Sequence, residues 1–218
     1  MSLPSLTLLE TRVLGVLVEK QRTVPDTYPL TLNALVAGCT QKTSRDPVIE
    51  ATDGQVQEAI DHLRTLSLVV ESSGGRVMRY SQNVARVLGL PTESVALLAT
   101  LMLRGPQTPA EIRQNAERLH RFADVSSVEA YLAELAARRD GPLVVELARA
   151  PGARETRWMH LLAGEPQIER AGPSPSVEHD SSTSELATLR REVDAVRGEV
   201  AELRSLLGRV MEELGLSR

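Results

Sequence analysis

The sequence predicts a mainly α-helical chain with two small β-hairpins, a linker and a long C-terminal helix. Three observations predict this architecture. Apolar residues recur with helical spacing, two short strand-like segments flank glycine-containing turns, and a strict heptad stripe closes the chain. The 218 residues include one Trp, three Tyr and one Phe, so the core must be built largely from aliphatic side chains, which suits helices.

Three helices and a hairpin are expected in residues 1–84. The predicted helices cover 6–20, 30–37 and a segment that Asp53 opens, and Gly38 is expected to close the second. An apolar run at 68–70, a turn at 73–75 and the alternating segment 76–80 then predict a hairpin.

The same order recurs in residues 85–163. Thr92 is expected to cap a helix, Thr108 to cap the helix 109–119, and Val128 to lie in a third helix, before strands at 143–145 and 155–161. Residues 56–63 match 128–135, and 76–80 match 154–158, each at a constant offset. Three helices and a hairpin in about 80 residues are the plan of a winged helix. The prediction is therefore two tandem winged-helix domains, 1–84 and 85–163.

The C-terminal region predicts a tether and an associating helix. Residues 164–184 are rich in Pro and Ser without an apolar period, which is typical of a flexible linker. In 185–216 the a and d positions of a heptad are Leu186, Leu189, Val193, Val196, Val200, Leu203, Leu207, Val210 and Leu214. Glutamates at g and arginines at e match in a parallel pair and clash in an antiparallel one. We expect a parallel coiled coil, dimeric or trimeric; the alternative is a helix folded back on its own domain.

Composition excludes several functional classes. A net charge of −4 is not that of a non-specific nucleic-acid binder, so a nucleic-acid site must be a local patch. No apolar run is long enough to cross a membrane, no signal peptide is evident, and Cys39 is a single cysteine. A cytoplasmic protein is expected. Without metal-ligand spacing or a P-loop, nucleophile or dinucleotide motif, we expect no enzymatic activity, cofactor or metal.

Four segments carry a resemblance to a known family. They are LETRVLGVLVEK, TYPLTLNALVAGCTQKTSRDPV, LMLRGPQTPAEIR and PGARETRWMHLL. Through them the chain resembles the YceH-like family of bacterial proteins over about residues 6–163. The resemblance implies a cytosolic bacterial protein with tandem winged helices, and it implies no catalytic residue.

The segment 40–47 is the first candidate nucleic-acid contact. It lies between two predicted helices and is longer than the turn of about 3–4 residues in a helix-turn-helix motif. Gln41, Lys42 and Arg45 have side chains suited to phosphate or base edges. The alternative is an intramolecular loop in which Arg45 pairs with Asp46 or Glu50.

The third helices and the hairpins supply the remaining candidates. Arg64 suits base reading, but Glu58 and Asp61 beside it would repel phosphate, which argues against simple sequence-specific binding. The hairpin arginines are Arg76, Arg79, Arg154 and Arg157. They could grip phosphates or a minor groove, or only protect sheet edges by their charge.

Arg104 and Arg113 bracket a short Gly-Pro-Gln-Thr segment. Together with the helix N-terminus at Thr108 they could hold an anion, and the alternative is an ordinary capped turn.

These features predict a DNA-binding, regulatory protein that uses tandem winged helices in a coiled-coil dimer. The expected partner is double-stranded DNA, together with a second copy of the chain. The alternative is a scaffold or adaptor whose winged helices bind a protein partner. A contiguous positive strip over both hairpins and the 40–45 segment favours DNA, whereas an exposed apolar patch favours a protein.

Replacing Val193 and Val200 by Asp is expected to yield monomers, because each change places a charge in the heptad stripe. Light scattering of the full-length chain measures the result. An assembly that survives both changes would contradict the coiled-coil prediction.

Overall fold

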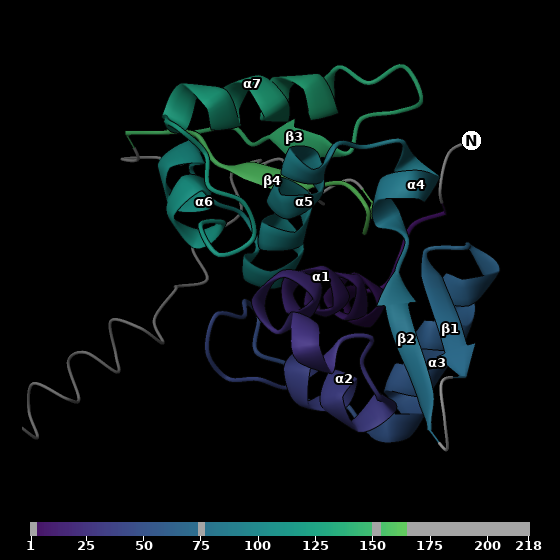
Figure 1. Ribbon diagram of the computed structural model, residues 1–218. Coiled ribbons are helices and arrows are strands. Elements are labelled where there is room, and N and C mark those ends of the chain that lie inside the picture. Colours follow the sequence, from purple (N-terminus) through teal and green to yellow (C-terminus); the bar gives the residue numbers. More distant parts are fainter. Residues whose placement is uncertain (1–3, 74–76, 150–153, 165–218) are drawn as a thin grey trace, which may run out of the picture. The chain divides into compact units, whose positions relative to one another are not determined.

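Two helices, α1 and α5, pack against each other between the elements of the two halves of the chain (Figure 1). The computed structural model describes residues 4–73, 77–149 and 154–164. The first half contains α1 (Leu8–Thr23), the 3₁₀ turn η1 (Pro25–Thr27), α2 (Leu32–Cys39), α3 (Asp53–Thr65), β1 (Val69–Ser73) and β2 (Met78–Gln82). A short helix that the sequence did not predict, α4 (Val84–Leu88), follows.

The second half has the same order of three helices and two strands, without counterparts of η1 and α4 among the described residues. It contains α5 (Thr92–Arg104), α6 (Pro109–Asn115), α7 (Val125–Ala136), β3 (Val144–Glu146) and β4 (Trp158–His160). The described part of the chain is thus mainly helical with two antiparallel two-stranded sheets, an arrangement consistent with a winged-helix-like topology. The predicted heptad helix, all but the first residue of the predicted linker, and residues 74–76 of the first hairpin lie outside the described residues.

Side-chain caps explain where most of the helices begin. The capping residues, each accepting a hydrogen bond from the backbone N–H three positions later, are Thr7, Thr31, Thr52, Thr108 and Asp124. In four of these helices a reciprocal side-chain bond completes a capping box. The third helix is therefore capped by Thr52 rather than Asp53, and Pro91 rather than Thr92 precedes α5.

The second helix is shifted relative to the prediction. Thr31 caps it, so it begins at Leu32, and Gly38 lies inside the helix instead of closing it. A Cβ atom at Gly38 would lie 2.5 Å from Cγ1 of Val16. The glycine therefore allows α2 to approach α1 closely.

Each hairpin pairs with one residue that precedes the second helix of its half. Leu30 and Tyr80 exchange two backbone hydrogen bonds, and Gln107 and Trp158 do the same. The hairpins themselves run in register from Val69↔Gln82 to Ser73↔Met78 and from Val144↔His160 to Glu146↔Trp158. Tyr80 and Trp158, which the offset between the two hairpins relates, thus occupy corresponding places.

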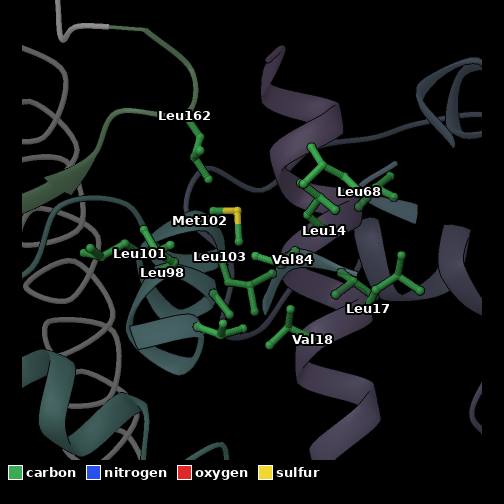
Figure 2. Close-up of a cluster of buried hydrophobic side chains, with 14 of the residues drawn as sticks. Leu14, Leu17, Val18, Leu68, Val84, Leu98, Leu101, Met102, Leu103 and Leu162 are labelled. Atoms are coloured by element: carbon green, nitrogen blue, oxygen red, sulfur yellow. The ribbon is translucent and has the colours of Figure 1, made fainter. Parts of the chain in front are cut away.

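The core continues from one half into the other. Every residue from Glu10 to Val18 of α1 and from Ser94 to Leu103 of α5 is buried. Figure 2 shows side chains of both helices meeting in one apolar cluster, with Val18 of α1 near Leu103 of α5. The sequence predicted helices with one apolar face, whereas α1 and α5 are buried on all sides over these residues. Among the described residues, no helix has the length and apolarity needed to cross a membrane.

Gly15→Ala is expected to lower the melting temperature by a few degrees. The added Cβ would lie 2.9 Å from Cγ of Leu103, where α1 meets α5. Overpacking typically costs about 1–3 kcal/mol, against a helix-propensity gain of about 1 kcal/mol. Gly54→Ala in α3 is the matched control, because its Cβ would meet nothing within 4 Å. A G15A variant as stable as G54A would show that the helices can separate at no cost.

Candidate nucleic-acid interface

Arg45, a candidate phosphate contact, lies inside the protein. Its two terminal nitrogens lie 3.2 and 2.7 Å from the two carboxylate oxygens of Glu19, and Nε donates to the carbonyl of Gly38 at 3.2 Å. None of the Arg45 side chain is exposed. The prediction that Arg45 binds nucleic acid is therefore wrong. Its partner is Glu19 of α1 rather than Asp46 or Glu50, because the loop folds back onto that helix.

A second buried arginine holds the same loop from the other side. Arg12 of α1 donates to the carbonyl of Cys39 at 3.3 Å and to that of Pro47 at 2.6 Å. The N–H of Asp46 donates to the carbonyl of Leu103 in α5 at 2.8 Å. The 40–47 loop is thus bonded to both halves, while Lys42 remains exposed on it. The side-chain amide of the third loop candidate, Gln41, donates to Thr43 within the loop.

The hairpin arginines are bonded to the backbone. Arg79 donates to the carbonyl of Pro29 and Arg157 to that of Pro106, both at 2.8 Å. Arg157 also lies 3.2 Å from a carboxylate oxygen of Glu111. Each arginine fixes its hairpin to the segment before the second helix of its half, a role that the sequence did not indicate. Arg154 is exposed, and Arg76 lies outside the described residues.

The exposed faces of the third helices are poor in positive charge. Arg64 of α3 is paired with Asp61 at 3.2 Å and with Glu71 of β1 at 2.5 Å. Helix α7 exposes Glu129 and Glu134 and contains no Lys or Arg. These faces would repel DNA phosphates, as the sequence indicated.

Positive charge gathers instead around α6. Arg113, Arg118 and Arg121 are exposed on α6 and the segment that follows it. Arg113 and Arg121 line one cavity of about 260 Å³, together with Gln114, Glu117 and Phe122. We call Arg113, Arg118 and Arg121 the α6 arginines. Only Arg113 was predicted, because no motif marked the other two. Arg118 fell inside the helix predicted over 109–119, whereas α6 ends at Asn115.

Arg104 lies on the other side of α6, at the junction of the two halves. It lines two neighbouring cavities, of about 310 and 210 Å³, which share Ser44, Arg104 and Asn115 and which we call the junction cavities. Arg113 lines neither cavity, and the N-terminus of α6 is closed by the capping box of Thr108 and Glu111. The predicted anion site between Arg104, Arg113 and Thr108 is therefore not formed.

Two buried titratable groups stand apart from these arginines. Burial raises the pKa of the free thiol of Cys39 to about 12 and lowers the pKa of His160 to about 4. Neither belongs to a cluster of His, Cys, Asp and Glu that could hold a metal within the part of the chain that the structure describes.

Comparison with known proteins places the chain among bacterial relatives. Residues 6–153 match the family described as "Protein of unknown function, DUF480". A UPF0502 protein of Dechloromonas aromatica is 61% identical over 208 residues, which cover 94% of this chain and 96% of the relative. UPF0502 proteins of Leptothrix cholodnii and Burkholderia multivorans are 59% and 56% identical, over 97% and 99% of this chain and 96% and 92% of theirs. The predicted family resemblance is confirmed, and these matches extend into the C-terminal region.

The pKa of Glu19 makes its pair with Arg45 sensitive to pH. Burial raises this pKa, but the hydrogen bond and charge of Arg45 and the charge of Lys20 lower it more, so the net pKa lies below the usual 4.5. A carboxylate with a lowered folded-state pKa contributes stability above its unfolded pKa and loses it as the pH falls through the folded value.

Arg45→Met is expected to destabilise the protein by about 3 kcal/mol at pH 7, because it leaves the largely buried Glu19 with Lys20 alone. The difference from wild type should shrink below pH 4.5, as Glu19 becomes protonated. Urea unfolding at several pH values measures both effects. Lys42→Ala, on the same loop but exposed, is the control and should change stability by less than about 0.5 kcal/mol. Equal stabilities of the two variants would contradict a structural role for Arg45.

Proposed function

We propose that this chain, which belongs to the bacterial DUF480 family of UPF0502 proteins, is a regulatory protein that binds double-stranded DNA. In this proposal the α6 arginines contact the phosphate backbone. The two halves act as tandem winged helices, and the C-terminal heptad helix joins two copies in a parallel coiled coil.

The position of the α6 arginines is the observation that carries the proposal. In a helix-turn-helix motif the first helix crosses the DNA backbone and the second enters the major groove. In this proposal α6 and α7, which follow each other in the second half of the chain, correspond to these two helices. The exposed arginines lie on the helix that would meet phosphates and on the segment directly after it, whereas α7 exposes only acidic charges. This distribution favours binding through phosphates over reading of base edges.

The repeated hairpin contacts support the tandem winged-helix interpretation. In both halves an arginine of the hairpin region bonds a proline carbonyl, and the next residue pairs with the backbone of the residue that follows that proline. A contact used twice at corresponding positions is expected of two copies of one motif.

Self-association would double the number of phosphate contacts. A parallel coiled coil of the heptad residues 186–214 would tether two sets of α6 arginines. The second contact would then form at a high effective concentration, set by the linker.

Binding of a protein partner is the second candidate function. Val70, Val77 and Met78 of the first hairpin region are 47%, 57% and 42% exposed. Helix α7 exposes Ala130 and Ala133 beside its two glutamates. Surfaces of this kind suit a protein better than a phosphate backbone.

Arg113→Ala combined with Arg121→Ala is expected to weaken binding of a mixed-sequence DNA duplex at low salt. Each lost phosphate contact should also reduce the slope of log affinity against log salt by about 1 per protomer. Fluorescence anisotropy of the full-length chain at several salt concentrations measures both quantities.

The control for this double variant removes the same charge elsewhere. Arg86 and Arg139 are exposed. They line neither the cavity formed by Arg113 and Arg121 nor the junction cavities, so R86A/R139A should keep the wild-type affinity for DNA. If wild-type protein does not bind the duplex at low salt, or if both variants lose affinity equally, the proposed interface is wrong. The protein-binding function then takes its place.

A further inference from the structure

The two junction cavities lie where the first and second halves of the chain meet. Ser44 comes from the 40–47 loop, Arg104 from the end of α5 and Asn115 from the end of α6, and all three line both cavities. Arg157 completes the wall of the larger cavity, and Arg118 that of the smaller one. Polar groups from four separate segments of the chain therefore line these two neighbouring cavities.

The charged side chains that line the two junction cavities carry a net positive charge. Among the described residues, the two cavities are lined by five cationic side chains, Lys20, Arg45, Arg104, Arg118 and Arg157. Three anionic side chains, Glu19, Asp46 and Glu111, line them as well. Glu19 pairs with Lys20 and Arg45, and Glu111 pairs with Arg157. Arg104 and Arg118 form no ion pair with any described residue, and Asp46, at the edge of the larger cavity, pairs with neither.

The positive charge of Arg104 is partly removed from solvent. Its side chain is half-buried, and burial lowers the pKa of its guanidinium. The charge of Glu19 raises this pKa in part and the charge of Arg45 lowers it, so the pKa stays below its ordinary value. A half-buried cation destabilises the folded protein unless anions compensate it, and Glu19, which already pairs with Lys20 and Arg45, compensates Arg104 only in part.

We propose that the junction cavities bind the phosphate group of a small phosphorylated molecule, with Arg104 as its principal ligand. Arg118 and the hydroxyl of Ser44 complete the site on either side. Bound there, the phosphate bridges the 40–47 loop of the first half and the α5–α6 region of the second.

The arrangement of donors favours phosphate over carboxylate. Guanidinium groups bind both oxyanions through paired hydrogen bonds. A carboxylate, however, presents two oxygens in one plane, whereas a phosphate accepts hydrogen bonds in several directions. Donors that approach from the loop, α5 and the end of α6 suit the tetrahedral group. The cavity that Ser44, Arg104 and Arg118 all line has a volume of about 210 Å³, below the range for drug-sized ligands, which limits the occupant to a compact group such as phosphate.

This site shares Arg118 with the proposed DNA interface, but its principal ligand, Arg104, lies outside that interface. Arg113 and Arg121 line a different cavity, so their removal should leave binding of a small phosphate compound intact. Conversely, loss of Arg104 should weaken that binding without removing those two DNA contacts. The two proposals can therefore fail independently.

The test is calorimetric titration of the full-length chain with sodium pyrophosphate in phosphate-free buffer at constant ionic strength. We expect saturable binding that Arg104→Met weakens about tenfold or more, as loss of a charged hydrogen bond predicts. The melting temperature of ligand-free R104M should equal or exceed that of wild type, since a half-buried charge is removed. R118A, which changes an exposed residue, should weaken binding as well, and it serves as the second variant if R104M does not fold.

Controls distinguish this site from general attraction of anions. R86A/R139A and R113A/R121A should bind pyrophosphate like the wild type, and citrate should bind at least tenfold more weakly than pyrophosphate. Absence of saturable pyrophosphate binding by wild type overturns the proposal. So does unchanged binding by R104M or, if R104M does not fold, by R118A. Citrate binding as tight as that of pyrophosphate overturns the assignment to phosphate.

Discussion

The packing of α1 against α5 is the constraint on which the rest of the structure depends. Gly15 lets the two helices come so close that even a methyl group would collide with Leu103. Because α1 carries Arg12 and Glu19, this contact also sets where the 40–47 loop is held. The end of α5 in turn carries Arg104 and accepts the N–H of Asp46 at Leu103. The loop and the junction cavities exist where they do because the two helices meet in one orientation.

Local sequence patterns predicted the helices and strands, whereas contacts between distant residues determine which of their faces are buried. Apolar periods and capping residues located six helices and both hairpins, since these signals act over a few residues. Helix α4 was missed because its five residues offer neither a period nor a side-chain cap. The burial of α1 and α5 on every side was missed for another reason. Each helix shows one apolar stripe in the sequence, and small residues such as Gly15, Ala96 and Ala99 fill the other contacts.

The candidate site was predicted less well, because a sequence does not show which groups an arginine meets. Arg45 reaches a carboxylate 26 positions away, and Arg79 reaches a proline carbonyl 50 positions away. Such partners are set by the tertiary fold, and a carbonyl leaves no mark in the sequence. Arginines that seemed free for phosphate are thus held by the protein itself. Three exposed arginines gather around α6, and Arg104 lies in a junction that exists only in the folded protein.

The two ends of the folded unit meet, which bears on how the fold can be rearranged. The N–H of Leu6 donates to the carbonyl of Leu162 at 2.8 Å, and a Cβ at Gly164 would lie 3.1 Å from the hydroxyl of Ser5. Chain entry and exit are thus neighbours, so a short peptide could join them and new termini could open in an exposed loop. The fold then does not depend on which half comes first in the polypeptide. Circular permutants that begin with the second half should reach the same fold.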